Sequence, residues 1–194
     1  MPDATELLSL ANLKSYLQIT GSTQDTILTS IKDAVESWVK QYVDRDLIVT
    51  SYTEYHDGDG SGSLKLRNYP ITTITSIYAD PARLFAAATL IPSTDIITSV
   101  TQNDNIGLVE LYSYRFLTGV KSIKVAYSAG YSTIPDRLAH AVKLLCAREF
   151  MIQDKRMSGL VTQQVGDKQI TLEFEAIPKN ALSILDKYRR IDVL

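Results

Sequence analysis

Oxygen-bearing side chains and glycines alternate in the stretch Asp57-Gly-Asp59-Gly-Ser61-Gly62, which is the spacing that opens a calcium-binding loop. Such a loop ends in a bidentate acid eleven residues after its first aspartate, and that position is Asn68 here. The flanking segments read as strands, and Asp/Gly-rich stretches are also common hairpin turns. We interpret the stretch as a solvated turn, and keep Asp57, Asp59 and Ser61 as a weak candidate cation site.

The two histidines and the single cysteine form no recognisable chemical grouping. His56 lies beside the aspartate-rich turn, while His140 and Cys146 lie on one expected helix. The sequence contains no HxxH or HExxH pair and no nucleophile elbow or phosphate-binding glycine motif. Cys146 falls in an apolar stripe without a basic neighbour, which is typical of a packing thiol. We therefore expect no catalytic residues, no bound transition metal and no cofactor.

The composition is that of an ordinary globular protein of 194 residues, 45% hydrophobic and 22% charged. A net charge of −2 does not favour tight binding to a phosphate backbone. Apolar runs are too short to cross a bilayer, and the acidic N-terminal stretch is unlike a signal peptide. One cysteine cannot form a disulfide within the chain. We predict a single domain carrying a large insertion, with no export and no membrane partner.

Hydrophobic spacing predicts an α+β fold with a four-helix core. The expected helices lie near residues 10–19, 24–43, 135–156 and 178–190. In the second helix, an apolar stripe is expected at Ile27, Ile31, Val35, Trp38 and Tyr42. Alternating residues predict a β-rich insertion over about 47–131, and a β-hairpin arm near 160–175 with its turn at Gly166-Asp167.

Several of these segments resemble the head–tail connector family of tailed phages, also called adaptor or head-completion proteins. The central segment reads VxYxAGYxxIPDxLxxAVxLLxAxxF from Val125 to Phe150. The opening LANLKSYLQITGSTQD, the helix exit DRDLI and the strand LRNYPITTITSI are similar to the same family. A glycine-flanked arm followed by a short helix ending in Tyr-Arg is the fourth such segment. The β insertion is longer than in compact members of the family.

This resemblance implies a structural virion protein rather than an enzyme. It implies a ring, usually of twelve subunits, beneath the portal protein, which extends the DNA channel and presents a docking surface to a downstream neck, stopper or tail-completion protein. Double-stranded DNA would pass through without specific contacts, and assembly would take place in the host cytoplasm. The C-terminal region, 178–194, would dock on the portal. The candidate portal-binding residues are Tyr188, Arg189, Arg190, Ile191, Asp192, Val193 and Leu194.

The alternative hypothesis is a phage DNA-packaging factor that binds nucleic acid directly. Retention on DNA that weakens with salt would favour it, whereas the acidic isoelectric point, about 5.7, speaks against it.

Overall fold

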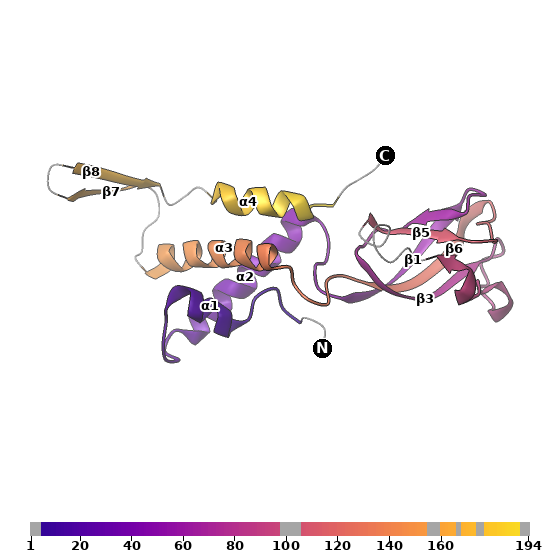
Figure 1. Ribbon diagram of the computed structural model, residues 1–194, viewed down its shortest axis with the longest axis horizontal. Helices are drawn as coiled ribbons and strands as arrows, with labels where there is room; N and C mark the ends of the chain where they lie inside the picture. Colours follow the sequence, from indigo (N-terminus) through magenta and orange to yellow (C-terminus); the bar gives the residue numbers. More distant parts are fainter. Residues whose placement is uncertain (1–4, 98–105, 155–159, 166–167, 174–176, 191–194) are drawn as a thin grey trace. The chain divides into compact units, whose positions relative to one another are not determined.

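The chain folds into two compact units, which a computed structural model describes over residues 5–97, 106–154, 160–165, 168–173 and 177–190. One unit, the helical unit, comprises Glu6–Arg45 and Ile134–Leu194. The other, the β unit, is formed by Asp46–Thr133. Figure 1 shows the helices and strands of each unit. We keep the prediction that the two units together form one domain, with the β unit as its insertion.

The four predicted helices are confirmed. They are α1 (Leu10–Leu17), α2 (Asp25–Val43), α3 (Asp136–Asp154) and α4 (Lys179–Leu185), the last continuing into a 3-10 turn over Asp186–Tyr188. The Ser9 hydroxyl caps α1 by accepting a bond from the Asn12 N–H at 3.3 Å. The core of the helical unit consists of Leu7, Leu8, Leu13, Leu28, Ile31, Val35, Val39, Val43, Leu138, Ala141, Val142, Leu145, Cys146, Ala147, Ala181 and Leu185.

The buried face of α2 is rotated from the predicted stripe. Ile31 and Val35 are buried as expected, but Ile27 is 42% exposed, and Trp38 is only half-buried. Their places in the core are taken by residues one position further along, at Leu28 and Val39. Two stripes of helical spacing overlap on this helix and share Ile31 and Val35, so apolar spacing alone could not separate them.

A buried lysine also lies on the core side of α2. The Lys32 ammonium contacts the carboxylates of Glu6 at 2.8 Å and Asp33 at 3.2 Å, with Glu36 at 3.9 Å. Glu36 in turn accepts a bond from the Leu8 N–H at 3.0 Å. Burial alone would lower the pKa of Lys32, but these acidic partners outweigh it and raise the pKa. The cluster fastens the segment before α1 to the middle of α2.

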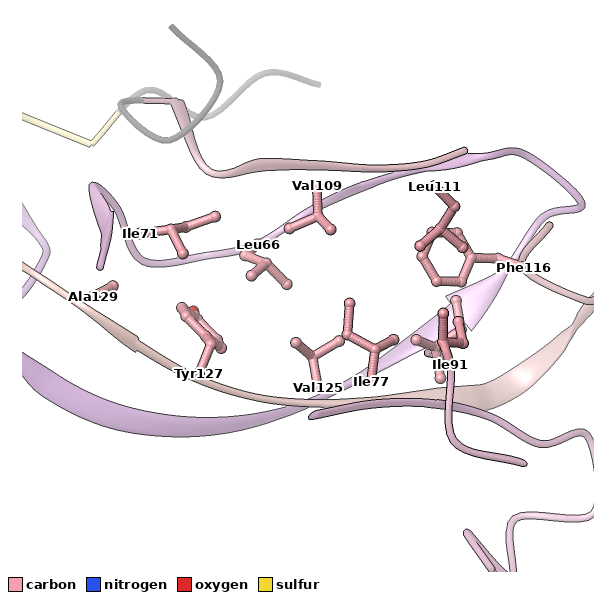
Figure 2. Packing of buried hydrophobic residues seen from close by; sticks show 11 residues of the cluster. Leu66, Ile71, Ile77, Ile91, Val109, Leu111, Phe116, Val125, Tyr127 and Ala129 are labelled. Atoms are coloured by element: carbon pink, nitrogen blue, oxygen red, sulfur yellow. The ribbon is translucent and has the colours of Figure 1, made fainter. Parts of the chain in front are cut away.

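The predicted β insertion is confirmed as two three-stranded antiparallel sheets. One has the order β1 (Thr50–Gly58), β6 (Gly119–Ala129), β3 (Ile71–Ala79). The other has the order β2 (Ser63–Lys65), β5 (Leu108–Leu111), β4 (Ile96–Ile97). Residues from both sheets meet in a shared core, as Figure 2 shows for Leu66 and Val109 opposite Val125 and Ile77. The segment before β4 contains two 3-10 turns, Ala87–Thr89 and Ser93–Asp95.

The predicted arm is confirmed as an antiparallel hairpin of β7 (Leu160–Val165) and β8 (Lys168–Glu173). Its register runs from the Leu160–Glu173 pair to the Val165–Lys168 pair. The predicted turn residues, Gly166 and Asp167, lie outside the described residues.

A polar network inside the β unit centres on the Glu54 carboxylate of β1. The Tyr127 hydroxyl donates to it at 2.5 Å, His56 Nε2 lies at 2.9 Å, and the Arg67 N–H donates at 3.2 Å. The Asn68 side-chain amide donates to the same group at 3.3 Å. Burial opposes ionisation of Glu54, but the hydrogen bonds outweigh burial and hold the pKa of the carboxyl below its ordinary value.

This lowered pKa predicts a stability term that acid removes. The unfolded-state pKa of a glutamate is about 4.3, so the contribution of ionised Glu54 is complete above that pH and is lost as the pH falls through the folded-state value. Glu54→Gln should lower the free energy of unfolding of the β unit at neutral pH. Below about pH 4 the difference in free energy of unfolding between this variant and wild type should become smaller. Chemical unfolding followed by circular dichroism at several pH values measures this. If this difference in free energy of unfolding stayed constant into the acid range, the ionised Glu54 carboxylate would not be the source of the stability.

Candidate docking site at the end of the helical unit

The helical unit ends in a strap, residues 186–190, which is bonded to the C-terminal end of α2. Ala181 and Leu185 of α4 are fully buried and anchor the helix that leads into the strap. Asp186–Tyr188 then form the 3-10 turn, and Arg189 leaves it in an extended conformation. The strap therefore begins from a fixed part of the core.

An aromatic column on α2 holds one side of the strap. The rings of Trp38 and Tyr42 stack with centroids 5.1 Å apart and an interplanar angle of 19°. The Tyr42 hydroxyl donates to Asp186 Oδ1 at 2.6 Å, and this bond raises the pKa of Tyr42. The Arg189 guanidinium carbon lies 5.9 Å from the Tyr42 ring centroid, within the range of a cation–π contact.

The C-terminal end of α2 and the two residues after it bind the other side of the strap. Arg45, which is buried, donates from Nε to the Tyr188 carbonyl at 2.7 Å. The Arg190 N–H donates to the Val43 carbonyl at 2.9 Å, and its guanidinium lies 3.4 Å from an Asp44 oxygen. A helix leaves its last carbonyls without partners inside the helix, and basic side chains there also complement the helix dipole. The strap thus completes the end of α2.

The predicted portal-binding residues are divided by this arrangement. Tyr188 and Arg190 are half-buried and take part in the strap, whereas Arg189 is exposed over Tyr42. Ile191, Asp192, Val193 and Leu194 lie outside the described residues. The strap fixes the point from which these four residues leave the helical unit.

An apolar groove of about 330 Å³ between α2 and α3 was not predicted from the sequence. It shares Trp38 with the aromatic column, so the groove and the column adjoin one another. The sequence did contain a signal for this groove: the apolar residues of α3 extend beyond one helical face, and such a helix is normally covered on more than one side. The residues that line the groove are Ile31, Ala34, Val35, Trp38, Leu145, Arg148, Glu149, Ile152, Gln153 and Ile177.

The candidate cation loop uses its oxygens within the turn. Asp57 Oδ1 accepts from the Lys121 N–H at 2.7 Å, and Asp59 Oδ1 accepts from the Ser61 N–H at 2.8 Å. The Ser61 hydroxyl donates to the Ser63 carbonyl at 2.8 Å. Within the described residues, no group of three or more His, Cys, Asp or Glu side chains is placed to hold a metal ion. The loop has the contacts of a structured turn.

The histidines and the cysteine all have contacts within the fold. His56 is bound to Glu54, as described above, and the His140 ring meets the Tyr16 ring edge-on with centroids 6.5 Å apart. Cys146 is fully buried, and burial raises the pKa of its thiol to about 12. A thiol with such a pKa remains protonated at neutral pH and is a poor nucleophile. No helix in the described part of the chain is long and apolar enough to cross a membrane.

The fold is shared with chains in solved structures of gene transfer agent (GTA) particles. The chain is similar to one in a structure described as the neck of an empty gene transfer agent (GTA) particle with C6 symmetry. That match has a TM-score of 0.59 and 18% identity, and covers 99% of this chain and 96% of the other. A chain from the virion of a native GTA particle matches with a TM-score of 0.58 and 18% identity, covering 100% and 96%. A third, from a native GTA neck with C12 symmetry, gives 0.57 and 16%, covering 99% and 96%.

The family is shown by sequence. Residues 6–191 match the model of the head completion protein family, and the chain belongs to this family. No curated protein matches the chain by sequence. The resemblance drawn from the motifs is therefore confirmed: the protein is a head–tail structural protein of the phage type and not an enzyme.

Proposed function

We propose that this protein is the adaptor of a phage neck, in which twelve copies form a ring beneath the portal protein. The ring extends the DNA channel and presents a surface to the downstream neck, stopper or tail-completion protein. Two of the similar GTA structures are described as necks, with C6 and C12 symmetry, and both symmetries are compatible with a ring of twelve. Assembly in the host cytoplasm and a final place in the virion neck follow from this role.

The observation that carries the portal assignment is the strap. Arg45, Asp44 and the Val43 carbonyl hold residues 186–190 against the end of α2, so the tail that follows leaves from a fixed point. A short segment that starts from a fixed point loses less entropy on docking than a freely moving one. Twelve such tails on one portal ring would also act together, because each attachment raises the effective concentration of the next. We assign portal binding to Tyr188, Arg189, Arg190 and residues 191–194.

Weak binding between the protein and the DNA in the channel suits this role. DNA must slide through the channel, and a net charge of −2 gives the protein little attraction for phosphate. Direct DNA binding, the alternative function, is tested in the same experiment by adding duplex DNA in place of the portal.

The test is attachment to purified portal rings of the same phage. Because Ala181 and Leu185 are core residues, a deletion must spare α4. Removal of residues 191–194, or the double substitution Arg189→Glu with Arg190→Glu, should reduce portal occupancy at least about tenfold, as loss of a few contacts multiplied around a ring predicts. Native mass measurement and electron microscopy report occupancy and copy number.

The matched control is Arg137→Glu, which reverses an exposed charge on α3. This variant should attach normally and be as stable as wild type. Full occupancy by the tail-deleted protein would refute the docking assignment, whereas salt-sensitive binding to duplex DNA by wild type would favour a packaging factor.

A further inference from the structure

The sheet of β1, β6 and β3 has two edges of different kinds, because β6 lies between the other two strands (Figure 1). The edge of β3 is covered: Tyr78 forms a bridge with Leu90, and the Ile91 N–H donates to the Ile77 carbonyl at 2.8 Å. Two irregularities also interrupt the pairing of β3 with β6. Covering segments and β-bulges are common ways in which proteins prevent an edge strand from pairing with another chain. The β3 edge is therefore protected.

The edge of β1 lacks this protection. Among the described residues, β1 pairs with β6 alone, and no strand lies on its other side. The pairing runs from Thr50 to His56 without a register shift, and this stretch contains neither lysine nor proline. Along the free edge of an antiparallel strand, backbone N–H and C=O groups of alternate residues point away from the sheet and can bind a further strand. β1 therefore presents an open and regular edge.

The two faces of β1 differ in exposure. Tyr52 packs against the core of the β unit, and Glu54 on the same face is also half-buried. Ser51 and Thr53, on the opposite face, are exposed. A strand added beside β1 would therefore suit the sheet best with apolar residues on the Tyr52 side and polar residues on the Thr53 side.

The hairpin arm of β7 and β8 is the second incomplete β element of the chain. Its two strands pair with each other and, within the described residues, with no third strand. A hairpin of two strands is at best marginally stable in water, and it gains stability from a third strand or from packing against another element. Both strands of the arm are edges. The arm is therefore suited, like β1, to become part of a larger sheet.

The residues of the arm alternate in the pattern that the β1 edge favours. Residues that pair across the two strands of a hairpin lie on the same face, and neighbours along each strand lie on opposite faces. In the register of the arm, the other face is polar except for Leu160, and the apolar residues that share one face are Val161, Val165, Ile170 and Leu172. Beside β1, the apolar face of the arm would continue the Tyr52 side of the sheet.

We propose that the arm of one copy adds to the β1 edge of a neighbouring copy, so that the sheet of β3, β6 and β1 continues into the two strands of the arm. Each chain has one open edge and one arm, so a closed ring in which every arm joins the next copy leaves neither without a partner. A strand from a different protein would cover β1 but leave the arm unpaired. This inference rests on the proposed ring, and it names the two surfaces that join neighbouring copies.

The contact has the geometry that a ring requires. It joins two different surfaces of the same chain, and such head-to-tail contacts generate rings when the rotation between copies closes. Backbone hydrogen bonds between strands supply much of the binding in strand addition, while alternating side chains fix which face is turned inward. Once a ring is partly formed, each further arm joins a neighbour that is already held in place, which raises its effective concentration.

Photo-crosslinking of protein assembled on purified portal rings tests the pairing. Thr53→p-benzoylphenylalanine places the probe at an exposed position of β1. This variant is labelled with heavy nitrogen and mixed with unlabelled wild type before assembly, so that mass spectrometry separates adducts within one chain from adducts between copies. We expect adducts that join labelled β1 to unlabelled peptides from residues 160–173. The matched control is Thr73→p-benzoylphenylalanine, at an exposed position of β3, which should give no adduct with this segment.

Hydrogen exchange of the wild-type protein provides a measurement without any substitution. Strand addition gives partners to the outward N–H groups of β1, which belong to every second residue. Their exchange should become at least about tenfold slower when the protein assembles on the portal. Exchange in β3 should change little, because its edge is already covered within the chain. Mass spectrometry with fragmentation that resolves single amides measures both strands in one sample.

The other outcomes refute the inference separately from the proposed function. If the protein occupies the portal fully, but the Thr53 probe gives adducts only within its own chain, only with the portal, or none, arms are not exchanged between copies and the adaptor role stands. Unchanged exchange in β1 within fully occupied rings has the same meaning. If wild-type protein does not attach to the portal at all, both the proposed function and this inference are refuted.

Discussion

Replacing Gly130 with alanine should lower the free energy of unfolding of the β unit by roughly 3 kcal/mol, and its Tm by about 15 °C. Gly130 has a φ of +127°, which side-chain-bearing residues rarely adopt. A Cβ there would lie 2.5 Å from the carbonyl of Ile48 and 2.6 Å from the nitrogen of Val49. Both obstacles are backbone atoms, so the side chain cannot be accommodated by a rotamer change. Thermal unfolding followed by circular dichroism measures the loss.

The control is Gly21→Ala in the helical unit. Gly21 has a φ of +81°, but no atom lies within 4 Å of the position that a Cβ would take there, so only the conformational cost of about 1 kcal/mol applies. If both substitutions destabilise equally, the close approach of Ile48 to Gly130 is not what restricts the site.

Replacing Arg45 with alanine should release the strap. The Tyr188 carbonyl would lose its bond from a charged donor, which is worth about 1.5–3 kcal/mol. The bond from the Arg190 N–H to the Val43 carbonyl should then open more often, and this amide should exchange its hydrogen at least about tenfold faster. Hydrogen exchange with mass spectrometry on the isolated protein measures this, and portal attachment should weaken in parallel.

Arg189→Ala is the matched control for the strap. Its guanidinium is exposed above Tyr42, a contact worth about 0.5–1 kcal/mol, so exchange at Arg190 should change little. Equal acceleration by the two alanine variants would show that Arg45 has no special part in holding the strap.

Helices and strands were predictable because long apolar repeats report them directly. The α3 segment combines a proline and an aspartate at its start with apolar residues at helical spacing, and it forms where predicted. The buried face of α2 was less predictable. Trp38 and Tyr42 are as hydrophobic as core residues, yet both are half-buried and stack on one another. Aromatic side chains with a polar atom favour such partly solvent-exposed positions. Lys32 is buried because Glu6, from a distant segment, joins Asp33 and Glu36 around its ammonium group.

The burial of two aspartates in the β unit, Asp80 and Asp95, was not predictable. Asp80 and Asp95 lie in segments without periodicity, and each is stabilised by backbone N–H groups whose positions depend on the fold. In contrast, the glycine-rich stretch at Asp57, which attracted a metal hypothesis, has the turn contacts that its composition favoured.

The strap was predicted as a region but not as a structure. The resemblance to the connector family implied a contact surface in the C-terminal region, 178–194. Nothing local showed that Arg45, more than a hundred residues earlier, would hold the Tyr188 carbonyl. Contacts between distant segments are set by tertiary packing, which apolar periodicity does not encode.

The chain enters and leaves the β unit side by side: Ile48 forms a bridge with Tyr131, and the Tyr131 N–H donates to the Leu47 carbonyl at 2.8 Å. A unit whose two ends lie side by side can be inserted into another fold without changing it much, because the helical unit needs only two neighbouring attachment points. The β unit could thus be exchanged for another module of the same kind without altering the helices.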